Sequence, residues 1–143
     1  MSDDLKIKNA INKFFESAKE LKNLGVIDSD RYLGDIGEYI FTKTTLGAAL
    51  EANKRTKGHD STFDGKKYQV KLNNSPTKTN INIGNTNEYD ILILIIGPDS
   101  CLTQPHGNNF LVYEFNATDL ANRKYIAKTE LNSKKNFKVY SLE

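Results

Sequence analysis

A two-stranded β-hairpin is predicted by residues 58–71, which read GHDSTFDGKKYQVK. Asp64-Gly65 is a strong signal for a two-residue turn, because both central residues of a type I′ turn need a positive φ. With that turn, Asp60 faces Gln69, at the distance of about 4.5–5.5 Å between opposed Cβ atoms. Lys71 lies diagonal to Asp60, about 7–8 Å away. The register therefore gathers all three side chains, unless a β-bulge near Asp60 shifts it.

The second arm of this hairpin alternates between apolar and polar side chains, as a half-buried strand does. The apolar face carries Tyr68, Val70 and Leu72, and the polar face carries Lys67, Gln69, Lys71 and Asn73. The same register pairs Thr62 with Lys67 and Phe63 with Lys66. An acid, a neutral carbonyl oxygen and a lysine on one polar face are able to hold a metal ion and activate a water.

Length and composition predict one globular domain spanning residues 1–143, with 38% hydrophobic residues. No apolar run approaches the roughly 18 residues of a membrane span, so no membrane partner is expected. Residues 1–6 read MSDDLK and contain no apolar signal core, which argues against secretion. Cys101 is the single cysteine, which excludes an internal disulfide and favours a reducing, cytoplasmic location.

The formal net charge of +2 does not by itself indicate a nucleic-acid partner. The distribution of the cations is more informative, because seven of them lie in or near the hairpin. They are Lys54, Arg55, Lys57, Lys66, Lys67, Lys71 and Lys78. Such a cluster fits contacts with phosphates, and it also fits a solvated strand and loop surface.

The hydrophobic pattern predicts the other elements. Helical spacing predicts two helices, and a continuous apolar run bounded by Gly97-Pro98 predicts a central strand buried on both faces. The expected helices span residues 4–23 and 30–44, the expected strands span 89–96, 110–115 and 137–140, and a short helix follows Asn116 or Thr118 up to about Lys124. Residues 73–87 and 99–109 are expected to be loops. The order of elements predicts an α/β (α+β) fold in which helices pack against a mixed sheet.

The second predicted helix carries charged residues on the side away from its apolar stripe. Arg31 and Glu38 fall almost in line there at 100° per residue, with Gly34 between them. A glycine is costly in the middle of a helix, so Gly34 is expected to mark a close approach by another backbone. The alternative interpretation is an exposed, charged helix face.

These features together resemble the PD-(D/E)xK nuclease superfamily, whose restriction-endonuclease-like core is a mixed β-sheet flanked by helices. The superfamily pattern is an acid on a helix, an Asp on one strand and an acid-x-Lys on the next strand. Glu38, Asp60 and Gln69-Val70-Lys71 match these positions, and Tyr89-Asp90 resembles the start of the strand that follows. Gln69 departs from the expected acid, and this Q-x-K variant is similar to Mrr-type restriction nucleases.

The resemblance implies a metal-dependent DNA endonuclease of restriction, defence or repair type that uses Mg²⁺, with Mn²⁺ able to substitute. Asp60 and Glu38 would be the carboxylate ligands, and Gln69 and the Val70 backbone would offer carbonyl oxygens. Lys71 would position and deprotonate the attacking water or stabilise charge on the phosphate. Glu38, Asp60, Gln69 and Lys71 are thus the expected catalytic residues.

DNA contacts are expected from cations around the hairpin and from the end of its second strand. The expected DNA-binding residues are Arg31, Lys54, Arg55, Lys57, Lys66, Lys67, Asn73, Asn74 and Lys78. Cleavage of both strands of a duplex would favour a symmetric homodimer.

Two other interpretations fit the same sequence. In the first, Gln69 marks weakened metal binding, and the chain is a catalytically weakened DNA-binding module on the same fold. In the second, the chain is a structural or protein-interaction domain whose Asp60 and Lys71 form a simple cross-strand ion pair. Such a surface pair contributes at most about 1 kcal/mol to stability.

Overall fold

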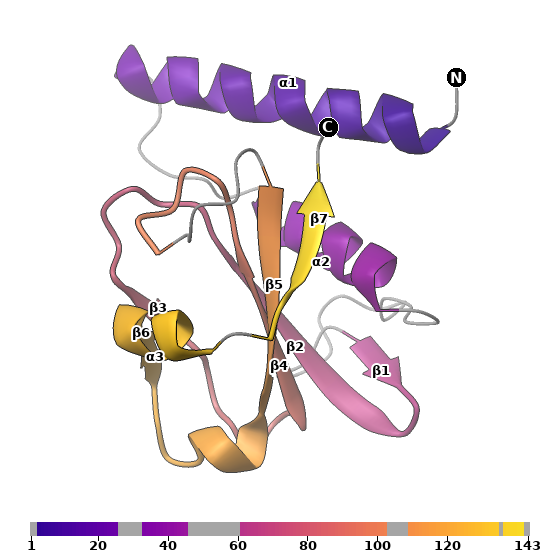
Figure 1. The fold of residues 1–143 in the computed structure, drawn as a ribbon, viewed down its shortest axis with the longest axis vertical. Helices are drawn as coiled ribbons and strands as arrows, with labels where there is room; N and C mark the ends of the chain where they lie inside the picture. The colour runs from indigo at the N-terminus through magenta and orange to yellow at the C-terminus, as the bar shows by residue number, and fades with distance from the viewer. Residues whose placement is uncertain (1–2, 26–32, 46–60, 103–108, 135, 142–143) are drawn as a thin grey trace.

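The architecture is mixed α and β, with one curled sheet of five strands in the order β1-β2-β4-β5-β7 (Figure 1). The computed structural model describes residues 3–25, 33–45, 61–102, 109–134 and 136–141. β2 and β4 are parallel, whereas the other neighbours in this sheet pair antiparallel. The strands are β1 Ser61–Phe63, β2 Lys66–Asn73, β4 Ile91–Ile96, β5 Asn109–Asn116 and β7 Lys138–Ser141.

Each face of this sheet has its own hydrophobic core. α1 (Asp3–Asn23) and α2 (Leu33–Thr44) cover one face, which we call the helix face. The opposite face is covered by a two-stranded sheet of β3 (Asn80–Asn82) and β6 (Tyr125–Ala127), together with the 3₁₀ helix η1 (Ala117–Leu120) and α3 (Lys128–Ser133). In Figure 1, α1 crosses one end of the five-stranded sheet. No helix within the described residues is long and apolar enough to cross a membrane.

The predicted hairpin is confirmed over the residues that the structure describes. Asp64 and Gly65 have φ values of 53° and 73°, the left-handed conformation that a type I′ turn requires. β1 and β2 pair with Phe63 opposite Lys66 and Thr62 opposite Lys67, as the sequence predicts. The described pairing begins at Ser61, opposite Tyr68.

The predicted central strand is confirmed as β4, and all six of its residues are buried. Its side chains alternate between the two cores, so Ile91, Ile93 and Ile95 face the helices. Asp90 fixes the register with β2 in two ways. The Lys67 N–H donates to Asp90 Oδ2 at 2.8 Å, and the Asp90 N–H donates to the Lys67 carbonyl at 2.8 Å.

Several other predicted elements are present with shifted bounds. The first helix, the strand at 110–115 and the edge strand at 137–140 are present as α1, β5 and β7. The described part of the second helix begins at Leu33. The short helix after Asn116 is the single 3₁₀ turn η1, and the Asn116 side chain makes no capping hydrogen bond.

The prediction that residues 73–87 form only a loop was wrong, because β3 lies within them. The hydrophobic pattern also does not predict β6 or α3. β3 and β6 pair over three residues each, and the buried residues Ile81 and Ile126 are directly opposite each other. Such short strands acquire their partners from distant parts of the chain, so local periodicity does not indicate them.

Candidate active site

Gln69 and Lys71 lie on the same face of β2, opposite the helix face. Their partners in the parallel register are Leu92 and Leu94, which belong to the core on that side. Both side chains are half-buried, whereas Val70 between them is 8% exposed and packs in the core of the helix face. The predicted alternation of β2 is therefore confirmed. It places the amide and the ammonium group on one polar strip with an apolar backing.

Glu38 lies half-buried on α2, the helix that packs directly on β2. The contact is close because Gly37 has no side chain. A Cβ atom there would lie 3.1 Å from Leu72 Cβ and 3.7 Å from Val70 Cγ1. α2 thus touches β2 at the two residues that flank Lys71 in the sequence. The close approach between α2 and β2 is therefore made at Gly37. The sequence predicted such an approach at Gly34, whose surroundings lie outside what the structure describes.

Within the described residues, β2 has a strand partner on only one side along its second half. Residues Gln69 to Asn73 pair with β4, whereas the described pairing with β1 ends at Tyr68. Asp60 directly precedes Ser61 in the sequence, but it lies outside the described residues. Its predicted position opposite Gln69 stays a prediction. Among the residues that the structure describes, no three His, Cys, Asp or Glu side chains are grouped so that they could hold a metal ion.

The predicted DNA-binding cations are only partly described. Lys66 and Lys67 are exposed at the hairpin turn, and Lys78 is exposed in the segment between β2 and β3. Exposed lysines of this kind are able to reach phosphates. Arg31, Lys54, Arg55 and Lys57 lie outside the described residues, so their predicted contacts stay predictions.

Asn73 and Asn74 are buried, with exposures of 8% and 6%. Asn73 Oδ1 accepts the Ser100 hydroxyl at 2.6 Å and the Ser75 N–H at 3.2 Å. Asn74 Oδ1 accepts the Asp99 N–H at 2.9 Å. These bonds attach the end of β2 to the turn after β4, so the amide oxygens have a structural role that the sequence analysis did not predict. Their contact with DNA stays a prediction.

Glu114 on β5 is an acidic residue that was not among the predicted site residues. It pairs with Ile93 and so lies on the helix face of the sheet, away from Gln69 and Lys71. It lines a cavity of 340 Å³ together with Thr45, Asn136 and Lys138. Burial raises the pKa of the Tyr68 hydroxyl, and the negative charges of Glu114 and Asp64 raise it further. This cavity is separate from the predicted site on β2.

No protein family matches the chain, and neither does any curated protein with which its sequence was compared. Function must therefore be inferred from the geometry of β2 and α2 and from the resemblance of their motifs. Fold alone does not determine activity, so the position of each candidate side chain matters. β2 brings Gln69 and Lys71 to one face, whereas α2, which carries Glu38, packs on the opposite face of β2.

Proposed function

We propose that the protein is a metal-dependent DNA endonuclease with a restriction-endonuclease-like fold, a Q-x-K variant of the PD-(D/E)xK superfamily that acts in the cytoplasm. The observation that carries the proposal is the position of Gln69 and Lys71. They share the polar face of β2, in a hairpin whose register agrees with the prediction as far as Ser61. If the pairing of β1 extends one residue further in this register, Asp60 faces Gln69.

The donors on α2 and β2 fit a hard cation. Mg²⁺ prefers oxygen ligands, and Gln69 offers an amide oxygen on the polar face of β2. Glu38 offers a carboxylate from α2, which packs on the opposite face of β2, so the two would meet at one ion only around the edge of the sheet. Asp60 would add the second carboxylate, and the Val70 backbone would add a carbonyl oxygen. When bound, Mg²⁺ or Mn²⁺ would lower the pKa of a coordinated water and neutralise charge on the phosphate.

Lys71 is the residue on which the chemistry depends most. Lys71 is half-buried and lies two residues from Gln69, on the same face of β2. From there it would orient the attacking water, help to remove its proton, or stabilise the negative charge that develops on the phosphate. Lys66, Lys67 and Lys78 would contact neighbouring phosphates and position the duplex.

Gln69 also supports a second candidate, a DNA-binding module on the same fold that does not cut. A neutral amide in place of a carboxylate removes one negative charge from the proposed metal site and weakens the attraction for a cation. The two candidates differ in what a divalent ion does. The nuclease cuts DNA only when the ion is present, whereas the module binds DNA equally well with and without the ion and does not cut it.

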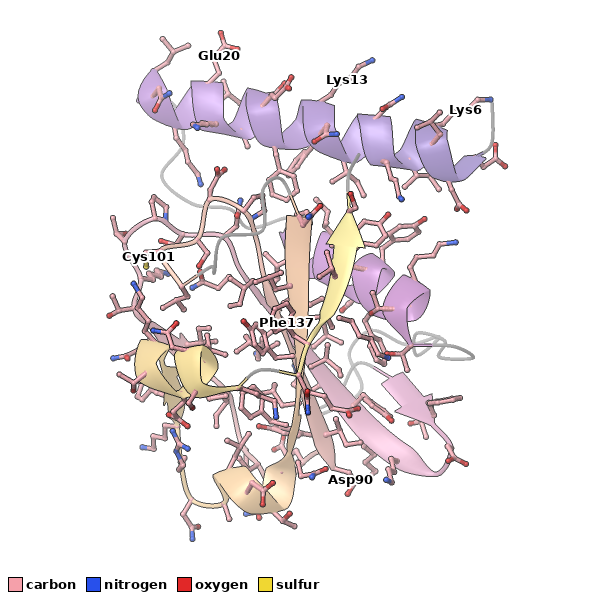
Figure 2. All side chains as sticks on the ribbon, in the orientation of Figure 1. Lys6, Lys13, Glu20, Asp90, Cys101 and Phe137 are labelled. Atoms are coloured by element: carbon pink, nitrogen blue, oxygen red, sulfur yellow. The ribbon has the colours of Figure 1, made fainter. Side chains whose placement is uncertain are left out.

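The proposed function is tested by cleavage of supercoiled plasmid and branched DNA, methylated and unmethylated, with Mg²⁺, Mn²⁺ or EDTA. The nuclease predicts cutting that needs the metal and is lost in Asp60→Asn and Glu38→Gln. Asp119→Asn and Glu20→Gln are matched controls, because both carboxylates are exposed and lie on other elements (Figure 2 labels Glu20).

Absence of cutting by well-folded wild-type protein on every substrate would contradict the nuclease. Binding of the same DNA in EDTA would then support the module, and Gln69→Glu would be the variant to assay next. Absence of both cutting and binding would contradict both candidates and leave the structural or protein-interaction role. A dimer in solution is expected if both strands of a duplex are cut.

A further inference from the structure

A cavity of 440 Å³ lies beyond the carboxyl ends of the parallel strands β2 and β4. One wall is the turn residues Asn74, Pro76 and Asp99, and the other is the carboxyl-terminal half of α1. In Figure 1 this half of α1 lies over the turn that follows β4. The volume is in the range of small-molecule sites, and the carboxyl ends of parallel strands are where open sheets commonly bind ligands.

Asn74 is a buried polar residue built into this cavity. It is 6% exposed, and its Oδ1 accepts the Asp99 N–H at 2.9 Å. Gly97 makes room for it, because a Cβ atom at position 97 would lie 2.2 Å from Asn74 Oδ1. With Oδ1 held by the backbone, the same amide presents Nδ2 as a donor. The fold thus fixes the orientation of an amide side chain that lines the cavity.

The α1 wall adds two cations on one side of the helix, Lys19 and Lys22. Lys22 also lies in the last turn, where a cation complements the helix dipole, so it is not specific evidence for a ligand. Lys19 is one turn earlier and exposed. With Asp99 opposite, the two lysines leave the cavity with one net positive charge.

The remaining lining distinguishes this cavity from a simple anion site. Phe15 and Pro76 provide apolar surface, and the Asp99 carboxylate provides an acceptor. Donors at one side, apolar walls and a carboxylate acceptor fit a ligand with an anionic group, a flat apolar part and a hydroxyl or amino group. A nucleotide has these three parts.

We propose that this cavity binds a 5′-nucleotide, whose phosphate lies against Asn74 Nδ2 and Lys19 while its base packs against Phe15 and Pro76. The nucleotide is either free or the 5′-terminal residue of a nucleic acid. The site is separate from the polar face of β2, so it does not depend on the proposed nuclease chemistry.

The test is calorimetric titration of the full chain with 5′-AMP in EDTA, with adenosine and inorganic phosphate as partial ligands. Binding of 5′-AMP tighter than either partial ligand is expected. Asn74→Asp keeps the acceptor for the Asp99 N–H and replaces the donor by a negative charge, so it should weaken binding by about tenfold or more. Lys19→Ala should weaken it by about threefold to tenfold.

Matched controls are available for both variants. Asn132→Asp and Lys13→Ala alter exposed residues on α3 and α1 away from the cavity, and affinity should stay within about twofold of wild type. Lys13 is labelled in Figure 2. Because Lys19 is exposed, its variant keeps the test valid even if Asn74→Asp folds poorly.

A 5′-phosphorylated oligonucleotide that competes with 5′-AMP, when its 5′-hydroxyl counterpart does not, would assign the site to nucleic-acid ends. Absence of competition would assign it to the free nucleotide. The proposal is overturned if millimolar 5′-AMP does not bind, or if Lys19→Ala and folded Asn74→Asp bind it as wild type does. Lys71→Met should bind 5′-AMP as wild type does, because Lys71 does not line the cavity. Loss of cutting in that variant is therefore distinguishable from loss of nucleotide binding.

Discussion

The two ends of β2 are fixed by different means. At the amino end, Asp64-Gly65 forms a tight turn that joins β2 to the strand immediately before it. At the carboxyl end, Asn73 and Asn74 bond to Ser100 and Asp99, which are 27 and 25 residues away in the sequence. One end is therefore fixed by local backbone preference, and the other by buried hydrogen bonds between distant segments.

Gln69 and Lys71 lie between these two ends. The difference predicts which end of β2 loses more free energy of unfolding when it is altered. A turn with compatible residues contributes mainly by limiting backbone freedom. A buried polar cluster contributes more to the free energy of unfolding, since removing one partner leaves another buried polar group unsatisfied. The carboxyl end should consequently be the more sensitive of the two. Three substitutions test this order, and a fourth tests a weaker interaction away from β2.

The largest effect is expected from Gly97→Ala at the carboxyl end. The new methyl group would lie 2.2 Å from Asn74 Oδ1, so either the turn or the amide must move. We expect the free energy of unfolding to fall by about 2–3 kcal/mol, as in overpacked sites. Chemical denaturation measures it. The double variant with Asn74→Ala should regain part of the loss, and strictly additive effects would contradict this contact.

Ser100→Ala should have the next largest effect. The hydroxyl donates to Asn73 Oδ1 at 2.6 Å and accepts the Leu102 N–H at 3.1 Å, and Ser100 is 3% exposed. Removing it leaves two buried groups without that partner, which should lower the free energy of unfolding by about 1–2 kcal/mol. Ser133→Ala, whose exposed hydroxyl donates to the Glu130 carbonyl, is the matched control. Equal losses in both variants would be inconsistent with the buried cluster.

Gly65→Ala tests the amino end and should cost about 1 kcal/mol. Gly65 has a φ of 73°, and an L-residue with a Cβ atom is strained in that conformation. Among the described residues other than its two chain neighbours, none has an atom within 4 Å of the position that the Cβ would take, so backbone strain is the expected cost. Denaturation under the conditions used for Gly97→Ala gives the comparison. A loss at Gly65 larger than that at Gly97 would reverse the proposed order.

The smallest effect concerns a local ion pair between Arg123 and Glu130, seven residues apart. The hydrogen bond from Arg123 holds the pKa of the Glu130 carboxyl below its usual value. Its contribution is therefore present above about pH 4.5 and is lost as the pH falls through the lowered pKa. The pair is partly exposed, so Glu130→Gln should remove at most about 0.5 kcal/mol at pH 7. The free energy of unfolding is measured from pH 3 to 7 for wild type and Glu130→Gln. The difference between them should be smaller at the acidic end.

The sequence predicted those parts of the fold that depend on local pattern. Period-two alternation assigned Gln69 and Lys71 to one face of β2, and the Asp64-Gly65 pair predicted the register. A continuous apolar run predicted the buried strand β4. Each of these signals is contained within about ten residues of the chain, so no distant partner is needed to recognise it.

Long-range contacts account for what the sequence did not predict. Asn73 and Asn74 have the composition of a surface loop, and the distant turn at residues 97–102 is what buries them. β3 and β6 are each too short to be recognised from their own residues, since each depends on pairing with the other. Gly37 was not distinguished from Gly34, because the contact with Leu72 becomes visible only when α2 is placed on β2.

The most direct test of the account is the initial rate at which Lys71→Met nicks supercoiled plasmid with Mg²⁺, compared with wild type. Methionine keeps the apolar stem that lies on β2 and removes the charge. Lys13→Met, an exposed change on α1, serves as the control. Wild type and the control should nick the plasmid in a metal-dependent way, and Lys71→Met should nick it about 10²–10⁴-fold more slowly at unchanged stability. Nicking by Lys71→Met at the wild-type rate would contradict this expectation.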